Sequence, residues 1–262
     1  MSMIKNPQEI EILKEGGKML SQILRELREK CVPGISTKSL DDYAQARMKE
    51  LGIEPSFLNY RISPSDPGYP AAVCVSMNEE VVHGIPMPDR IIQKGDIVSM
   101  DIGAWHKGLC TDMATSVIAG GTDNQEIANL VSNTREGLAL GIATIKSGSL
   151  ISDIGDAIDD YLTPKGYGIV RDLVGHGVGH EVHEDPVIPN YREPRAPEVI
   201  CRTGMVLAIE PMVTIGDWRV RQLDDGWTIV TKDKKPAAHF ELTVTVTDDG
   251  YELITPWPDT NE

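Results

Sequence analysis

The feature that most constrains the fold is an internal repeat. Each half of the chain contains a helical segment, a histidine-containing turn and two strand-like runs, in the same order. The matching ranges are 33–52 with 147–166, 82–86 with 182–186, 94–102 with 203–211, and 111–118 with 240–247. One such match would be weak evidence. Four in one order indicate two αα-plus-β halves around a pseudo-twofold axis, within one domain of residues 1–262 whose half-repeats span about 7–120 and 123–250.

Hydrophobic periodicity and turn residues predict the elements of each half. A helix is expected over 7–30, capped by Asn6, and another over 37–51 that ends at Gly52. In the second half, Asp123 is expected to cap a helix that reaches about Ile145, and a further helix is expected over 152–162. Strands are expected near 71–77, 80–84, 96–105, 109–118, 169–176, 180–184, 205–214, 218–222, 227–231 and 239–247. The predicted class is α+β.

The repeat pairs acidic residues that follow apolar runs on predicted strands. Asp101 aligns with Glu210 and Asp112 with Glu241, while His83 aligns with His183 in a neighbouring turn. Any one of these acids alone is best interpreted as a strand-end residue that faces water. A buried carboxylate is costly unless a cation or hydrogen-bond donors lie beside it. Four acids at equivalent positions therefore indicate one shared cationic centre.

The segment GHGVGHEVHEDP, residues 175–186, contains three of the six histidines: His176, His180 and His183. A helical zinc site is disfavoured, because each of the alternating glycines costs about 1 kcal/mol inside a helix. The motif HExxH is also absent. In a strand or tight loop, His176 and His180 share one face and His183 takes the other. At most one or two of the three then point to a single centre.

The donor set indicates divalent ions such as Mn²⁺, Fe²⁺, Co²⁺ or Zn²⁺. Oxygen donors with few histidines do not fit a cysteine-rich structural zinc site, and the four cysteines lie far apart without a CxxC pair. Four carboxylates and one histidine are too many for one small ion and suit two. Two ions bridged by carboxylates would lie roughly 3.5–4 Å apart with a hydroxide between them.

Composition excludes several partners. The formal net charge of −15 argues against a nucleic-acid surface and against an anionic membrane surface. The sequence has no apolar run of signal-peptide or membrane-span length. Reduced thiols and a cytoplasmic location are therefore expected.

Five segments in this order resemble the motifs of type I methionine aminopeptidases: HGIP (83–86), DIGAWHKGLCTDMATSV (101–117), GHGVGHEVHEDP (175–186), GMVLAIEPM (204–212) and FELTVTVT (240–247). The resemblance covers nearly the whole chain. It implies the pita-bread (creatinase/aminopeptidase) fold as a single catalytic domain. It also implies a hydrolase of protein maturation, a metalloaminopeptidase that removes N-terminal methionine from nascent proteins and peptides with a small second residue.

The resemblance also implies a role for each ligand. Asp101 would chelate one metal ion, and Asp112 and Glu241 would bridge both ions. His176 would bind the second ion. Glu210 would bind that ion too. It is also a candidate for the general base that takes a proton from the bridging water. The resemblance further implies a monomeric protein. Its expected partners are the N-termini of peptides or of nascent chains, which it would meet at the ribosome.

Other residues would contact the substrate. His83 and His183 would donate hydrogen bonds to the scissile peptide. The residues that match the methionine pocket are Tyr69, Cys74, Trp227 and Val182.

The chain departs from the family pattern in several places. The loop 58–70 is longer, Pro67 replaces a histidine, Val182 replaces Phe or Met, and His239 replaces Gln. A role for His239 beside the ligands stays open, and His180 has no assigned role.

Three other interpretations fit the sequence less well. A prolidase or aminopeptidase P would usually add an N-terminal domain, yet only about 80 residues precede His83. A type II methionine aminopeptidase would need a long insertion in the second half, and only 26 residues lie between His183 and Glu210. A binding protein with the same fold but no catalysis would have little reason to keep all five ligand positions.

Overall fold

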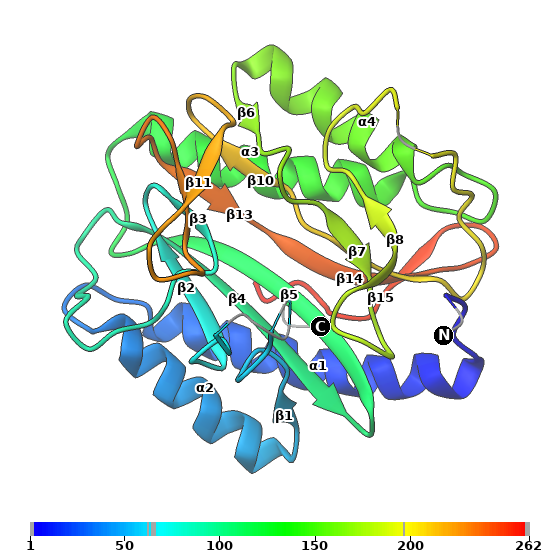
Figure 1. Ribbon diagram of the computed structural model, residues 1–262, viewed down its shortest axis with the longest axis horizontal. Helices are drawn as coiled ribbons and strands as arrows, with labels where there is room; N and C mark the ends of the chain where they lie inside the picture. Colours follow the sequence, from blue (N-terminus) through cyan, green and yellow to red (C-terminus); the bar gives the residue numbers. More distant parts are fainter. Residues whose placement is uncertain (1–2, 62, 64–66, 196, 260–262) are drawn as a thin grey trace.

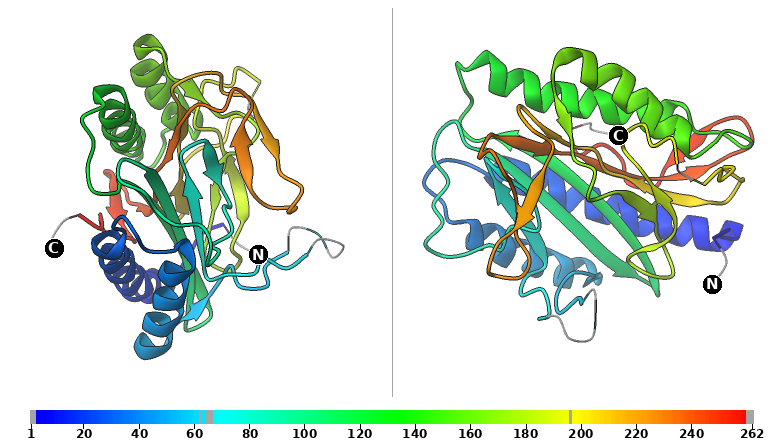
Figure 2. Two further views of the ribbon diagram at one scale, coloured as in Figure 1. Left: turned by 90° about the vertical axis from the view of Figure 1, so that its left-hand side faces the viewer. Right: turned by 45° about the horizontal axis from the view of Figure 1, so that its top comes forward.

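The computed structural model describes residues 3–61, 63, 67–195 and 197–259. Four helices are found in this part of the chain: α1 (Pro7–Lys30), α2 (Thr37–Leu51), α3 (Gln125–Ala143) and α4 (Ser152–Leu162), which a 3-10 turn over Thr163–Lys165 extends. They lie on one side of a curved sheet, as the left view of Figure 2 shows. None of these helices combines the length and the apolar character that a membrane span needs.

The main sheet contains nine strands (Figure 1). They are β1 (Glu54–Pro55), β2 (Val73–Met77), β4 (Ile97–His106), β5 (Leu109–Ile118), β7 (Gly175–Gly177), β8 (Glu184–Ile188), β9 (Val206–Ile209), β14 (Glu241–Val246) and β15 (Tyr251–Leu253). The order along the sheet is β1-β4-β5-β14-β9-β7-β8, with β2 paired to β4 and β15 paired to β14. The central order β2-β4-β5-β14-β9-β7 places equivalent strands of the two halves symmetrically about the contact between β5 and β14. This arrangement agrees with the predicted α+β class and paired halves.

Two small sheets lie beside the main one. One has the order β13 (Ala237–His239), β10 (Met212–Thr214) and β6 (Gly168–Ile169). The other has the order β11 (Val220–Gln222), β12 (Ile229–Thr231) and β3 (Glu80–Val82). They lie on the side of the main sheet away from the helices (Figure 2).

Helix ends follow local chemistry. The Asn6 side chain accepts from the Glu9 amide and the Glu9 carboxylate accepts from the Asn6 amide, which forms the predicted cap. Gly52 ends α2 with φ 70°, a conformation that suits glycine. The expected cap at Asp123 was wrong. Asn124 caps α3, because its side chain accepts from the amides of residues 126 and 127.

Several predicted strands were divided. The run 205–214 forms β9 and β10, separated at Glu210 and Pro211, where proline has no amide hydrogen to continue the ladder. The run 239–247 is likewise shared between β13 and β14, which belong to different sheets. The strand expected at 180–184 was wrong, because the chain bends there and β8 begins at Glu184.

Alternation on β4 separates the core from the opposite face. Val98, Met100 and Ile102 are buried in the main hydrophobic cluster with Leu20 and Leu24 of α1. Since side chains alternate across a strand, Asp101 points away from this core. The helices therefore stabilise the sheet from one side and leave the other side for polar chemistry.

We predict that Gly17→Ala destabilises the fold, although alanine normally favours a helix interior over glycine by about 1 kcal/mol. A Cβ at Gly17 would lie 2.1 Å from the carbonyl oxygen of Ile254, which is backbone and cannot rotate away. The expected loss is about 1–3 kcal/mol in the free energy of unfolding, measured by urea denaturation. Lys18→Ala, at the exposed neighbouring position, is the control and should change stability little. A more stable Gly17→Ala protein would contradict the packing described.

Candidate metal centre

Strand register places the predicted ligands on one face of the sheet. Asp101 and Glu241 both lie opposite Ala114, and directly opposed residues of antiparallel strands share a face. Asp112 lies two residues from Ala114 on β5, so it shares this face as well.

The second half reaches the same face by an equivalent route. Ala208 lies opposite both His176 on β7 and Thr243 on β14. Thr243 is two residues beyond Glu241, and Glu210 is two residues beyond Ala208, just past the end of β9. Sheet pairing alone therefore brings all five predicted ligands together.

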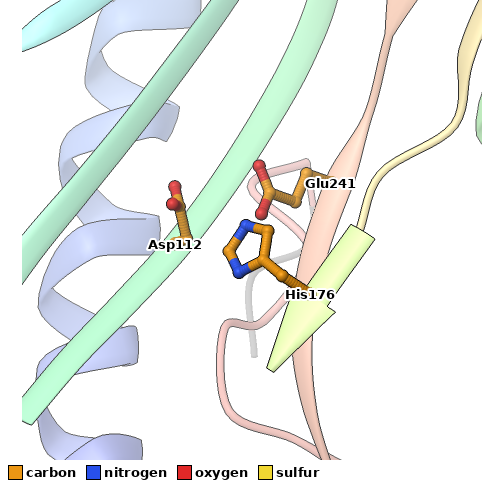
Figure 3. Close-up of side chains that lie close together, drawn as sticks. All are labelled: Asp112, His176 and Glu241. Atoms are coloured by element: carbon orange, nitrogen blue, oxygen red, sulfur yellow. The ribbon is translucent and has the colours of Figure 1, made fainter. Parts of the chain in front are cut away.

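The side chains converge closely enough to hold a metal ion. Ligand atoms of Asp112, His176 and Glu241 lie within 4.8 Å of one another, and Figure 3 shows these groups side by side from three strands. Ligand atoms of Glu210, His239 and Glu241 form a second set within the same limit. Asp101 lines the same cavity as the other four predicted ligands.

The carboxylates are buried and incompletely paired. Asp101 is 8% exposed, Asp112 3% and Glu241 2%. One oxygen of each, Oδ1, Oδ1 and Oε1 respectively, has no hydrogen-bond partner in the described part of the chain. Such groups are unfavourable unless a cation compensates their charge. The unpartnered oxygens and the hard donor set thus fit divalent ions.

Burial also determines the protonation of these groups in the absence of a cation. It raises the pKa of Asp101 from 3.8 to about 7, with nearby Glu210 adding to the rise. It raises the pKa of Glu210 from 4.5 to about 8. The pKa values of Asp112 and Glu241 are raised well above their ordinary range, first by burial and then by the neighbouring carboxylates.

His176 is held as a neutral ligand. Its Nδ1–H donates to the carbonyl oxygen of Gly177 at 2.9 Å, so the lone pair is on Nε2, which lies 3.5 Å from Oε1 of Glu210. Burial, with a contribution from His183, lowers the pKa of His176 to about 3.

The glycines on either side of His176 are required by packing. A Cβ at Gly175 would lie 2.5 Å from the Ala208 carbonyl, and one at Gly177 would lie 2.2 Å from the Asp185 carbonyl.

A cavity of about 340 Å³ opens beside these ligands. Its remaining wall is mainly apolar and aromatic, and it includes Tyr69, Cys74 and Trp227. Tyr69 is fixed by a hydrogen bond from its hydroxyl to the Gly84 carbonyl at 2.8 Å and by an edge contact with Trp227 at 5.2 Å between ring centroids. Residues of the wall that the sequence did not indicate are Phe57, Tyr60, Val82, Asp172, Leu173, Val174 and Met212.

Val182 does not line this cavity. It is 4% exposed and packs in a second hydrophobic cluster with Val178, Leu13 and other residues. The same cluster contains Tyr69, Cys74 and Trp227, so Val182 packs with the other predicted pocket residues although it is not among the residues that line the cavity. The longer loop at 58–70 is described only in part, since residues 62 and 64–66 lie outside the described residues, and the described Pro67 is not among the cavity's lining residues.

His83 and His183 both line the cavity. His83 has φ 58°, an uncommon conformation outside glycine, and burial first, then His239 and His183, lowers its pKa to about 4. The Nδ1 of His183 lies 2.6 Å from the hydroxyl of Tyr60, and its ring lies 4.3 Å from that of His176 between centroids.

Two further residues contact Glu210. The backbone of Glu210 is held on both sides by Asn190, whose Nδ2 donates to the carbonyl at 3.2 Å and whose Oδ1 accepts from the amide at 3.3 Å. The Nε2 of His239 lies 3.5 Å from Oε2 of Glu210, and neither ring nitrogen of His239 forms a hydrogen bond within the described residues. The two-residue spacing from Glu241 indicated His239, whereas Asn190 carries no sequence signal because a long loop separates it from Glu210.

His180 lies apart from the ligands. Its Nε2 lies 2.9 Å from Oε1 of Glu9 on α1. It belongs to a cluster on the outer side of the loop that precedes β8.

Known proteins resemble this chain over nearly its full length. The model of metallopeptidase family M24 matches residues 11–248. A methionine aminopeptidase of Clostridium acetobutylicum is 42% identical over 256 residues, which are 97% of this chain and 99% of that protein. The crystal structure of a methionine aminopeptidase from Thermotoga maritima has a TM-score of 0.92 and 45% identity, and covers 97% of this chain and 99% of that one.

A more distant similarity concerns the fold alone. A prolidase from Pyrococcus furiosus has a TM-score of 0.76 at 22% identity. The match covers 97% of this chain but 65% of the prolidase chain. The pita-bread fold expected from the motifs is thus confirmed by both comparisons of structure. The chain belongs to metallopeptidase family M24 and, within it, to the methionine aminopeptidases.

Proposed function

We propose that the chain is a methionyl aminopeptidase that hydrolyses the bond after the N-terminal methionine of nascent proteins and peptides with a small second residue. The observation that carries this proposal is the meeting of five ligand side chains, some with unpartnered buried oxygens, at one end of an aromatic cavity. Membership of the methionine aminopeptidases supports it over prolidase activity, since the methionine aminopeptidases are 42% and 45% identical to this chain and the prolidase only 22%.

Two divalent ions, of Co, Mn, Fe or Zn, are proposed to bind to Asp101, Asp112, His176, Glu210 and Glu241. When bound, they would acidify a shared water and polarise the scissile carbonyl. Asp112 and Glu241 are suited to bridge because they lie at the centre of the sheet face, on the two strands that join the halves.

Glu210 is the proposed general base. The two hydrogen bonds from Asn190 fix its backbone, and its two carboxylate oxygens each lie 3.5 Å from a histidine nitrogen, of His176 and His239 respectively. A carboxylate held in this way can take a proton without losing its orientation.

His83 and His183 are proposed to hold the scissile peptide. When the Tyr60 hydroxyl donates to Nδ1 of His183, the proton of the neutral ring is on Nε2 and is available to the substrate. A hydrogen bond from this position would stabilise the oxyanion and help the leaving amine to depart.

The methionine side chain is proposed to occupy the space between Tyr69, Cys74 and Trp227. A thioether packs well against aromatic edges and a thiol. Burial raises the pKa of the Cys74 thiol well above its ordinary range, so the thiol stays neutral and places no charge in the pocket. Val182 would affect the shape of this pocket only indirectly, by packing in the same hydrophobic cluster as the pocket residues.

We further propose that residues 1–262 act as a single catalytic domain of two half-repeats. A cytoplasmic monomer that meets nascent chains at the ribosome is consistent with the strongly negative net charge, which disfavours direct binding to nucleic acid or membrane.

The substrate can be tested with a peptide panel and added Mn²⁺, Fe²⁺, Co²⁺ or Zn²⁺. Met-Ala-Ser should be cleaved, whereas N-acetyl-Met-Ala-Ser and Ala-Pro should not, because the proposed site requires a free α-amine and accommodates methionine. Chromatographic detection of free methionine, and of free alanine and proline for Ala-Pro, provides the measurement. Cleavage of Ala-Pro without cleavage of Met-Ala-Ser would instead favour a prolidase.

Asp101→Asn should abolish cleavage of Met-Ala-Ser and weaken metal binding measured by calorimetry, because the amide cannot supply the missing charge. Its circular dichroism spectrum should stay that of the parent protein, since the side chain keeps its size. Asp89→Asn, at an exposed position outside the cavity, is the matched control. Full activity of Asp101→Asn would refute the proposed ligand set.

Metal removal should make stability fall as pH rises. The folded metal-free protein keeps protons on Asp101 and Glu210 up to about pH 7 and 8, whereas the unfolded chain releases them near 3.8 and 4.5. Below about pH 6.5 the buried histidines act in the opposite direction, because His176 and His83 are neutral in the folded state above pKa values of about 3 and 4, whereas an unfolded histidine still binds a proton up to about pH 6.5. Above about pH 6.5 only the carboxylates make the folded state bind more protons, and the free energy of unfolding therefore decreases from about pH 6.5 to pH 8.

The measurement is Tm across this pH range with and without a chelator. The difference between metal-loaded and chelated protein should grow toward pH 8, and Asp101→Asn should reduce the slope of the chelated protein. A chelated protein whose Tm rises steadily over the same interval would contradict the prediction.

A further inference from the structure

The bend over residues 178–183, which ends at His183, is contacted by the N-terminal segment of the chain. Lys5 precedes α1 and Glu9 lies in its first turn, while His180 lies within the bend and Glu184 directly follows it. We call these four residues the Lys5 cluster. None of them lines the cavity beside the metal ligands.

Two contacts tie the segment to the bend. The Nζ of Lys5 forms an ion pair with Oε1 of Glu184, the residue directly after His183. The Nε2 of His180 lies 2.9 Å from Oε1 of Glu9, and Nδ1 of the same ring lies 3.9 Å from Oε2 of Glu184. The cluster therefore holds the bend on both sides of His183.

Lys5 is enclosed rather than lying on the surface. Its side chain is 0% exposed, and its backbone amide donates to the Gly204 carbonyl at 2.8 Å. Gly179 has φ 141°, and a Cβ there would lie 2.5 Å from Cε of Lys5. The bend thus has a glycine at the position where the side chain of Lys5 packs against it. Because a buried ammonium group is unfavourable unless it is paired, Lys5 depends on its ion pair with Glu184.

Backbone hydrogen bonds hold the start of the bend, where the Val178 amide donates to the Val206 carbonyl at 3.2 Å and the Cys110 amide donates to the Gly179 carbonyl at 2.7 Å, but they give the rest of the bend little support. Among the described residues, the only backbone hydrogen bond outside regular strands that involves residues 180–183 is the one from the Gly179 amide to the Glu181 carbonyl, at 3.1 Å. Loops with few internal hydrogen bonds sample more conformations. The position of His183 therefore depends on contacts made by neighbouring side chains.

We propose that Lys5 and Glu9 are positioning residues, which act through Glu184 and His180 to hold His183 at the scissile bond. This inference rests on the proposed function for the role of His183. Because a hydrogen-bond donor must be placed within a fraction of an ångström to stabilise a transition state, release of the bend should lower kcat more than it raises KM.

Lys5→Met tests the ion pair, with Lys18→Met as the control on the exposed side of α1. With Met-Ala-Ser and Mn²⁺, we expect kcat of Lys5→Met to fall by about 10-fold and KM to change less. Hydrogen exchange followed by mass spectrometry should show faster exchange of amides 178–184 in Lys5→Met and not in Lys18→Met.

His180→Ala tests the second contact and does not leave a buried lysine unpaired. His106→Ala is the matched control, because Nε2 of His106 lies 3.2 Å from Oε2 of Glu15 on the same helix, and no ion pair joins His106 to Glu9 or Glu184 among the described residues. His180→Ala should speed exchange at 178–184 and lower kcat, whereas His106→Ala should do neither. If Lys5→Met does not fold, the comparison of His180→Ala with His106→Ala tests the proposal instead.

A double-mutant cycle separates positioning from a general loss of structure. If Lys5 acts through His183, then Lys5→Met should lower kcat about 10-fold in the parent protein and by less than about twofold in His183→Ala. Full additivity in the cycle, or unchanged exchange at 178–184 in both Lys5→Met and His180→Ala, would overturn the proposal. Failure of the parent protein to cleave Met-Ala-Ser would overturn the proposed function instead, and the exchange data would still show whether the cluster holds the bend.

Discussion

The structure depends on four carboxylates that share one buried face of a sheet. Asp101, Asp112, Glu210 and Glu241 repel one another, and no lysine or arginine forms an ion pair with them within the described residues. Such an arrangement is unfavourable for the protein alone, as the pKa values raised by burial indicate. Proteins retain arrangements of this kind where function requires them. The rest of the fold can be understood as the support that keeps these acids together.

That support is the contact between β5 and β14. Ala114 on β5 lies opposite Glu241 and also opposite Asp101 on β4, so one small residue separates carboxylates from the two halves. Helices cover only the other face, and the apolar residues of β4 that alternate with Asp101 pack there against α1. The hydrophobic core and the polar centre are therefore two sides of the same strands, and the alternation of side chains maintains both.

Much of this could be predicted from the sequence because the relevant signals are local or repeated. The cap at Asn6, the stop at Gly52 and the acid-bearing strands follow from neighbouring residues, and the repeat placed distant acids in one site before any contact was known. The errors have tertiary causes. Lys5 pairs with Glu184, directly after the bend at 178–183, although it is more than 170 residues away in the sequence, and Val182 within the bend is buried in a cluster with Leu13 of α1. Asn190 and Tyr60 contact Glu210 and His183 through loops whose paths no periodicity reveals.

The two halves are alike in backbone but differ at one pair of positions next to the centre. Ser76 lies opposite Ser99 on the first half's strands, just as His176 lies opposite Ala208 in the second half. Ser76 accepts a hydrogen bond from the Gly84 amide, whereas His176 points its free nitrogen to Glu210. Such divergence removes the equivalence of the two approaches to the site. A chain end entering the cavity then meets a ligand imidazole on the strand of the second half and a serine at the equivalent strand position of the first, so the fold's near-symmetry does not oblige it to accept a peptide in two opposite directions.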